Sequence, residues 1–202
     1  MKTDDDALAL AAGLTRRTEQ LAAGLEDGSA DLYELVMQLG LRKFTLIGHS
    51  MGGLTAMQFA VNHPALLKGL VLLDPAGPDG PELSDEQVER FLDERAAMRR
   101  DAMQRGAAAG GLDAEEGAFD PEQMRLLVAD IAAAPERRLR GSMRSLLRSR
   151  ISEQVRRLPM PALLAAGERD ALVPLAGMLG TWRTLPPGSG LHVWHGVGHS
   201  PN

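Results

Sequence analysis

The chain contains no cysteine among its 202 residues. This absence excludes disulfide bonds, thiolate nucleophiles and cysteine metal ligands, and it is neutral between reducing and oxidising compartments. The sequence also lacks an apolar run long enough to span a membrane. Its first six residues, MKTDDD, hold three acids where a secretory leader needs positive charge. We therefore expect a cytoplasmic protein without a membrane span.

An excess of basic residues is lacking as well, because the formal net charge is -5 at pH 7. Nucleic-acid binding depends on positive patches that contact phosphates, so this charge balance argues against a nucleic-acid partner. Apolar residues make up 44% of the chain and charged residues 24%, which is ordinary for a folded protein. At this length the chain fits one domain that buries its own core. No residue pattern indicates a cofactor.

Strand, helix and strand signals follow one another in the first half of the chain. Residues 44–47 (FTLI) and 70–73 (LVLL) are short apolar runs typical of buried parallel strands. Between them, residues 52–60 have small and apolar side chains at helical spacing, and Pro64 favours an end to that helix. Connections of this kind between parallel strands form right-handed crossovers. The sequence therefore predicts an α/β fold with an open, mostly parallel sheet of about four strands.

Two helices are expected before the first strand. Residues 5–24 are rich in Ala and Leu, which favour helix by intrinsic propensity. A break at Gly28 and Ser29 should separate this helix from a second one over residues 31–39. Gly40 is suited to end the second helix in a left-handed cap. Its apolar positions recur at helical spacing, so it should pack on the core.

The sheet pattern is interrupted by a long helical stretch and then resumes. Strands are expected at residues 162–167 and 191–194, with a helix between them over residues 175–185. Residues 81–158 show only helical periodicity, so we interpret them as a helical lid inserted into the domain. The single domain, residues 1–202, would then have a core made of residues 1–80 and 159–202.

Within the predicted lid, the arginine-rich stretch from 137 to 157 has apolar residues at three- and four-residue spacing. This pattern indicates one amphipathic helix. Its charged face is expected to lie in water, and attraction of an anionic substrate or a membrane surface is the alternative.

The most specific local signal is the pentapeptide Gly48-His49-Ser50-Met51-Gly52, a G-x-S-x-G pattern placed between a predicted strand and a predicted helix. A sharp turn there holds the serine in strained backbone geometry, and only residues with little side chain should fit at Gly48 and Gly52. The Met51 N–H and the helix N-terminus offer positive potential to a developing oxyanion. The pattern predicts that Ser50 is a nucleophile.

This arrangement resembles the alpha/beta hydrolase family over the chain from about Asp31 to its end. The resemblance implies that Asp170, in the segment GERDALVP, is the acid, and that His199, in GVGHSP, is the general base. The order Ser50, Asp170, His199 is the nucleophile, acid, base order of this fold. The resemblance also implies that each residue lies at the carboxyl end of a strand.

Rival assignments remain open at this point. Glu168 and Asp74 are alternative acids, because both lie close to the end of a predicted strand. His195 competes with His199 for the role of base. A metal site built from His192, His195 and His199 is a further reading, although no HExxH pattern supports it.

The family pattern also identifies what this chain lacks. Members of the family carry several strands before the elbow, with a His-Gly loop that supplies a second oxyanion N–H, and nothing in residues 1–40 resembles that loop. The family also adds a closing helix after the histidine loop. The resemblance therefore implies a chain truncated at both ends, with an incomplete oxyanion hole. The strand at residues 44–47 would become an open sheet edge, covered by the N-terminal helix, by a second copy in a homo-oligomer, or left exposed.

The resemblance implies a serine hydrolase that cleaves a carboxylic ester or a related acyl bond of a small molecule through an acyl-enzyme. Amides, lactones and carbon–carbon bonds beside a carbonyl fit the same chemistry. The serine nucleophile argues against the dehalogenase and epoxide hydrolase branches, which use Asp. The alternative is a catalytically inactive hydrolase-like domain, because an incomplete oxyanion hole weakens catalysis. A binding module has no positive support in the sequence.

Overall fold

The computed structural model describes residues 24–104, 129 and 133–199. The helix predicted over residues 5–24 therefore lies almost wholly outside the described residues. The elements, in chain order, are α2 (Leu25–Gln38), β1 (Phe44–His49), α3 (Met51–Asn62), the 3-10 turn η1 (Pro64–Leu66), β2 (Leu67–Leu73), α4 (Asp85–Gln104), α6 (Glu136–Arg148), α7 (Ser152–Arg156), β3 (Ala162–Gly167), α8 (Leu175–Thr184) and β4 (Gly190–Trp194).

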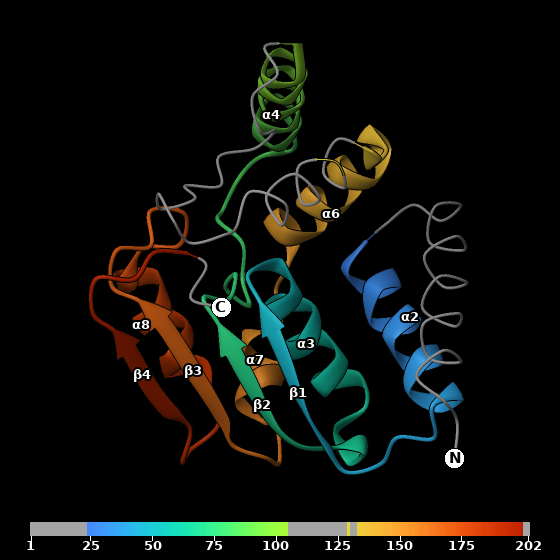
Figure 1. Ribbon diagram of the computed structural model, residues 1–202, viewed down its shortest axis with the longest axis vertical. Helices are drawn as coiled ribbons and strands as arrows, with labels where there is room; N and C mark the ends of the chain where they lie inside the picture. Colours follow the sequence, from blue (N-terminus) through green and yellow to red (C-terminus); the bar gives the residue numbers. More distant parts are fainter. Residues whose placement is uncertain (1–23, 105–128, 130–132, 200–202) are drawn as a thin grey trace.

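The described strands form one sheet in the order β1-β2-β3-β4, and every neighbouring pair is parallel. The prediction of an open, parallel sheet with four strands is confirmed. All four arrowheads point toward α4 and α6, so the carboxyl ends of the strands lie together at one edge (Figure 1). Loops that leave this edge bring distant parts of the chain together, as is usual for ligand sites in open α/β sheets.

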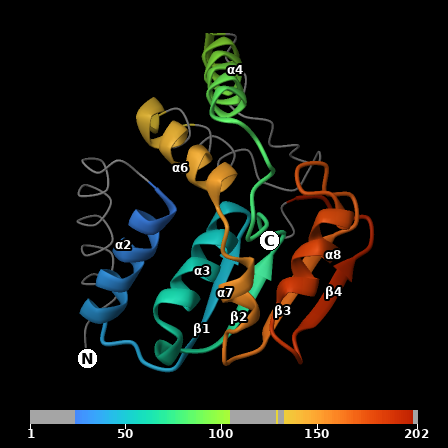
Figure 2. The same ribbon diagram turned by 180° about the vertical axis from the view of Figure 1, so that it is seen from behind.

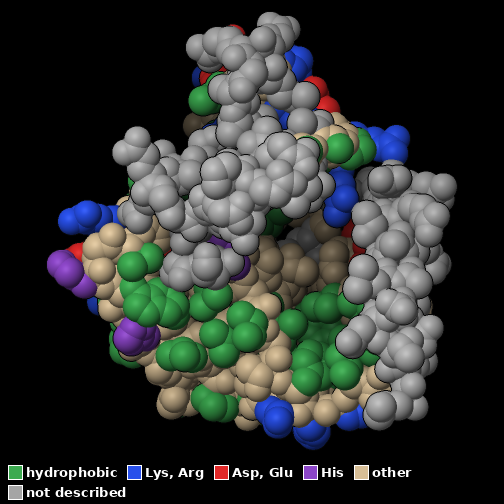
Figure 3. Space-filling model, viewed as in Figure 1, with side chains coloured by type: hydrophobic (Ala, Val, Ile, Leu, Met, Phe, Trp, Pro, Cys, Tyr) green, Lys and Arg blue, Asp and Glu red, His purple; other side chains and the backbone are tan. Residues whose placement is uncertain are grey.

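One face of the sheet carries the main core. Helices α3, α7 and α8 cover the face of the sheet that is turned toward the viewer in Figure 2, and α2 packs on α3. Leu72 and Leu164, on adjacent strands, are completely buried beneath them. The opposite face holds Ile47 in β1, which is 62% exposed, and Leu163 in β3, which is 41% exposed. Apolar side chains gather on that face in Figure 3.

The predicted break at Gly28 and Ser29 is wrong, because α2 runs through both residues. A Cβ at Gly28 would touch Thr55 Cγ2 at 3.4 Å, so the missing side chain lets α2 approach α3 closely. Ser29 is completely buried, and its Oγ accepts a hydrogen bond from Asn62 Nδ2 at 3.2 Å. Packing between the two helices outweighs the weak local preference against helix.

The end of α2 follows the prediction. Gly40 has φ +66°, and its N–H donates to the carbonyl oxygen of Met37 at 3.2 Å. The N–H of Leu41 donates to the carbonyl oxygen of Val36 at 3.0 Å. These bonds satisfy carbonyls that the last helical turn leaves without helical partners, and glycine adopts the left-handed geometry at little cost.

Helices α4 and α6 lie beyond the carboxyl ends of the strands and pack on each other (Figure 1). A small apolar cluster joins them, centred on Val88, Leu92 and Leu147. Arginines on α6 are paired with acids on α4: Arg140 contacts Asp93 at 2.6 Å, and Arg144 contacts Glu89 at 2.7 Å. The arginine-rich face thus meets carboxylates of a neighbouring helix rather than water alone. Neither α4 nor any other described helix is long and apolar enough to cross a membrane.

The single amphipathic helix predicted in the arginine-rich stretch is also wrong, because the chain breaks at residues 149–151 and forms two helices, α6 and α7. Ser149 Oγ donates to the carbonyl oxygen of Pro78 at 2.6 Å, and Ile151 N–H donates to the same oxygen at 3.2 Å. These bonds join the two ends of the insertion. Beyond the break, Val155 and Leu158 belong to the main core under the sheet.

We expect the two faces of the sheet to differ in their contribution to stability. Leu72→Ala should lower the free energy of unfolding by about 2–5 kcal/mol, because it leaves a cavity in the buried face. Ile47→Ala should change it by less than about 1 kcal/mol, since that side chain is mostly exposed. Urea unfolding followed by circular dichroism measures both. An equal loss for the two variants would show that the face carrying Ile47 is covered.

Candidate active site

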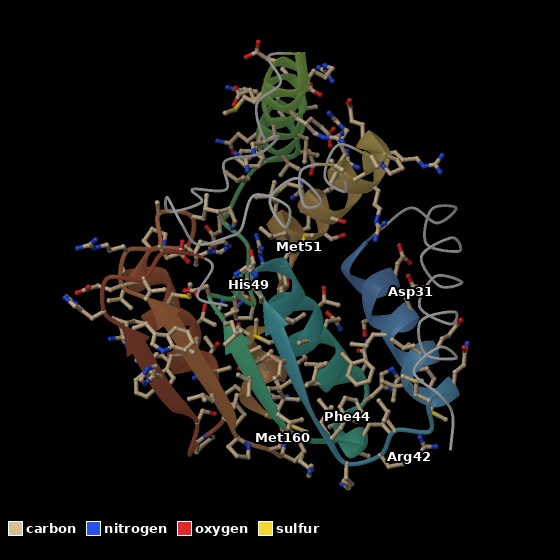
Figure 4. All side chains as sticks on the ribbon, in the orientation of Figure 1. Asp31, Arg42, Phe44, His49, Met51 and Met160 are labelled. Atoms are coloured by element: carbon tan, nitrogen blue, oxygen red, sulfur yellow. The ribbon has the colours of Figure 1, made fainter. Side chains whose placement is uncertain are left out.

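The site begins at the turn between β1 and α3. Ser50 has φ 52° and ψ -122°, a left-handed conformation that is costly for a residue with a side chain. Its N–H donates to the carbonyl oxygen of Leu73 at 3.0 Å, and its carbonyl oxygen accepts hydrogen bonds from Gly53 at 3.0 Å and Ala76 at 2.9 Å. Ser50 lies in the chain between the labelled His49 and Met51 at the carboxyl end of β1 (Figure 4).

Close packing at this turn depends on Gly48 and Gly53. A Cβ at Gly48 would lie 2.4 Å from the carbonyl oxygen of Gly52, and a Cβ at Gly53 would lie 2.7 Å from Pro75 Cβ. The sequence pattern pointed to Gly48 and Gly52 instead. A Cβ at Gly52 would meet no atom of the described residues within 4 Å, so the steric argument fails there. The second required glycine is Gly53, because α3 crosses the loop after β2 at that point.

The three side chains predicted to act together are brought together. His199 Nε2 lies 2.9 Å from Ser50 Oγ, and His199 Nδ1 lies 2.7 Å from Asp170 Oδ2. An Nδ1–H that donates to the carboxyl group leaves the Nε2 lone pair free to accept the Ser50 hydroxyl proton. This hydrogen-bond arrangement matches that of a serine nucleophile with a base and an orienting acid.

Asp170 is held rigidly in the loop after β3. Its side chain is completely buried, and its Oδ1 accepts hydrogen bonds from the N–H groups of Leu172 and Val173, both at 2.8 Å. The second carboxyl oxygen is thereby left for His199. Asp170 therefore caps the turn with one oxygen and contacts His199 with the other.

The rival residues are placed elsewhere. Glu168 Oε2 pairs with His195 Nδ1 at 2.6 Å and accepts the N–H of Gly196 at 3.0 Å. The His195 side chain is 89% exposed. Both ring nitrogens of His199 face Ser50 and Asp170, which does not suit a shared metal site with His192 and His195. Among the described residues, no group of three His, Asp or Glu side chains is placed to hold a metal ion.

Asp74 is a second buried carboxyl group at the same edge of the sheet. Its Oδ1 accepts the N–H of Gly167 at 2.7 Å, whereas its Oδ2 has no hydrogen-bond partner among the described residues. Burial raises the pKa of Asp74 above its ordinary value, the bond from Gly167 opposes this rise, and the charge of Asp170 adds to it. His199 contacts Asp170 and not Asp74.

Two contacts of the histidine loop, residues 195–199, were not predicted. His49 Nε2 lies 2.6 Å from the carbonyl oxygen of His199, and the Glu168 carboxylate binds Gly196 as described above. Both depend on side-chain rotamers across the strand ends. Neither periodicity nor motif spacing carries a signal for them, although the position of His49 beside Ser50 marks it as close to the site.

Comparison with known proteins places this geometry in a wider context. A family model described as alpha/beta hydrolase fold matches residues 17–202. A candidate carbamate hydrolase, RutD, of Pantoea ananatis (strain LMG 20103) is 26% identical over 187 residues, covering 87% of this chain and 64% of that protein. A pimeloyl-[acyl-carrier protein] methyl ester esterase of Yersinia enterocolitica is 26% identical over 167 residues, covering 80% of this chain and 63% of that protein.

Solved structures agree with this placement. The malate-bound structure of a thermophilic esterase from Thermogutta terrifontis superposes with a TM-score of 0.63 at 29% sequence identity. The match covers 89% of this chain and 66% of the esterase. Against the curated relatives the share is lower, since the chain spans 55% to 64% of the length of the first four that it matches.

The two elbow glycines should respond differently to a methyl group. Gly48→Ala should lower the free energy of unfolding by at least about 1–3 kcal/mol, because its Cβ overlaps the backbone of α3. Gly52→Ala should be neutral or should stabilise the protein by up to about 1 kcal/mol, since alanine favours the helix. Thermal and urea unfolding compare them. A Gly52→Ala loss as large as that of Gly48→Ala would contradict the packing described here.

The Asp74 carboxyl group should lower the free energy of unfolding as pH rises. Because its pKa is raised in the folded protein, the folded state binds more protons than the unfolded chain between the two pKa values, and stability is lost as pH increases through that window. Asp74→Asn should remove this dependence, so its unfolding free energy should improve relative to the parent as pH rises from about 4 toward neutrality. Urea unfolding at a series of pH values tests this, with exposed Glu82→Gln as the control. A difference that stays constant with pH would contradict the assignment.

Proposed function

Because the chain belongs to the alpha/beta hydrolase fold family, we propose that it is a serine hydrolase that cleaves a carboxylic ester or a related acyl bond. The observation that carries the proposal is the continuous path of hydrogen bonds from Ser50 Oγ through His199 to Asp170. The esterase and hydrolase names of the relatives support the same reaction class.

In the proposed reaction, Ser50 Oγ attacks the carbonyl carbon of the substrate while His199 Nε2 takes the hydroxyl proton. The resulting imidazolium gives this proton to the leaving alcohol, and the acyl group stays on Ser50. A water molecule then loses a proton to His199 and attacks the acyl carbon. The bond from this carbon to Ser50 Oγ breaks, the imidazolium returns its proton to Ser50 Oγ, and the acid is released. Asp170 orients the ring and stabilises its positive charge through Nδ1–H.

The oxyanion of each tetrahedral intermediate needs hydrogen-bond donors. Met51 N–H is suited to this role, because it is the first amide of α3 and points from a helix N-terminus, where N–H groups have no helical acceptor. A single N–H donor stabilises the oxyanion less than the usual pair of donors, and no second donor is assigned among the described residues. The alternative predicted from the sequence, an inactive hydrolase-like domain, rests on this point.

We also propose that α4 and α6 form the lid that selects the substrate, since they lie beyond the strand ends where Ser50 is found (Figure 1). The lid would then begin after Pro78 and end before Ile151, where a hydrogen bond joins the two segments of the chain. Helix α7 follows Ile151 and belongs to the core. Arg140 and Arg144 are engaged by acids of α4, which disfavours an anionic substrate held by them. A small-molecule acyl substrate that does not need to bind these arginines through a negative charge fits better. Cytoplasmic location and a homo-oligomer that covers the β1 edge stay predictions.

Covalent labelling tests the proposed function directly. The parent should react with a fluorophosphonate probe and turn over a short-chain aryl ester. Ser50→Ala should abolish labelling, and His199→Ala should lower ester turnover by about 10⁴-fold or more, because the serine loses its base. His195→Ala, which changes the rival base in the same loop, should keep both activities.

The same experiment separates the two candidate functions. Circular dichroism first confirms that every variant is folded. A folded parent without labelling or turnover would sink the hydrolase proposal and leave the inactive domain. Loss of activity in His195→Ala with retention in His199→Ala would reassign the base.

A further inference from the structure

The histidine loop is attached to the strand ends at two separate places. On the β3 side, Arg169 N–H donates to the carbonyl oxygen of Val197 at 2.8 Å, and Glu168 N–H donates to that of Trp194 at 3.0 Å. These bonds fix the start of the loop. At its far end, the main-chain carbonyl of His199 is met by the His49 ring. The proposed base therefore has a main-chain contact on the β1 side, next to the nucleophile.

We propose that His49 is a positioning residue for the proposed base, acting through a hydrogen bond from its Nε2–H to the main-chain carbonyl of His199. The 2.6 Å separation requires a donor, because a carbonyl oxygen only accepts. The centroids of the His49 and His199 rings lie 5.0 Å apart, with an interplanar angle of 45°, so the two rings also pack against each other. The inference rests on the proposed function, since it assigns the residue that holds the base at its working distance from Ser50.

The position of His49 in the chain makes this contact effective. His49 directly precedes Ser50, so any movement of the strand end displaces the hydroxyl and the ring donor together. The bond to the His199 carbonyl therefore ties the position of the base to that of the nucleophile. The 2.9 Å contact between His199 Nε2 and Ser50 Oγ depends on this spacing. A displacement of about 1 Å between reacting groups can cost on the order of 100-fold in rate.

The contact also explains why a histidine, rather than a smaller residue, stands before the nucleophile. The ring is half-buried at the end of β1, and its Nε2 extends far enough to reach the main chain of a loop 150 residues away. Both the neutral Nε2–H tautomer and the protonated ring can donate this bond. His49 has no place in the proton transfers, since His199 already contacts both Ser50 and Asp170.

The test compares His49→Gln with His49→Asn and His49→Leu in the full chain. The Gln amide nitrogen extends about as far as histidine Nε2, the Asn amide is too short, and Leu has no donor. The second-order rate of fluorophosphonate labelling and the kcat and KM for an aryl ester are measured for each folded variant. His49→Leu and His49→Asn should lose about 10- to 100-fold in labelling rate and in kcat, with KM changed by less than about threefold. His49→Gln should recover to within about fivefold of the parent.

A second readout does not need activity. The proton on His199 Nδ1, shared with Asp170, should give a far-downfield proton NMR signal in the parent and in His49→Gln, and a broadened or missing signal in His49→Asn and His49→Leu. If the parent fails to label, the proposed function fails, and the NMR comparison alone decides the role of His49. Parent-like labelling and NMR signals in His49→Asn or His49→Leu would overturn the inference. Equal losses in all three variants would overturn it as well, because the donor would then not be what matters.

Discussion

The left-handed conformation of Ser50 is the constraint on which the rest of the site depends. The turn is stable only because neighbours satisfy its backbone: Ser50 N–H bonds to β2, and its carbonyl oxygen accepts from α3 and from the loop after β2. Gly48 and Gly53 allow these segments to approach within distances that a side chain would forbid. The strain is therefore held by packing between three consecutive elements, so Ser50, the proposed nucleophile, lies where a strand, a helix and a second strand meet.

Two buried carboxyl groups at the strand ends show how surroundings separate similar residues. Asp170 has two main-chain donors on one oxygen and an imidazole on the other, so both carboxyl oxygens have hydrogen-bond partners. Asp74 has one main-chain donor and an oxygen without a partner among the described residues, and its burial raises its pKa. This difference in hydrogen-bond partners, rather than position in the sequence, distinguishes the two acids.

The strands and their parallel arrangement could be predicted from apolar patterns, and Ser50 from its motif. Asp170 and His199 were assigned through the resemblance to the hydrolase family, and their contacts are visible only in the structure. The failures have tertiary causes. Nothing local reveals that Gly28 sits inside α2, since its packing partner is on α3. Periodicity continues unbroken across Ile151, so the division of α6 from α7 depends on bonds to Pro78, more than 70 residues earlier. Contacts made by His49 depend on rotamers and loop geometry, which a sequence pattern does not encode.

The strand that leads to the proposed nucleophile is an edge strand of the described sheet. In the described sheet β1 pairs only with β2, and Ile47, three residues before Ser50, is largely exposed. Local opening of a sheet begins where few contacts hold it, so the strained turn at Ser50 relies on α3 and β2 for its stability.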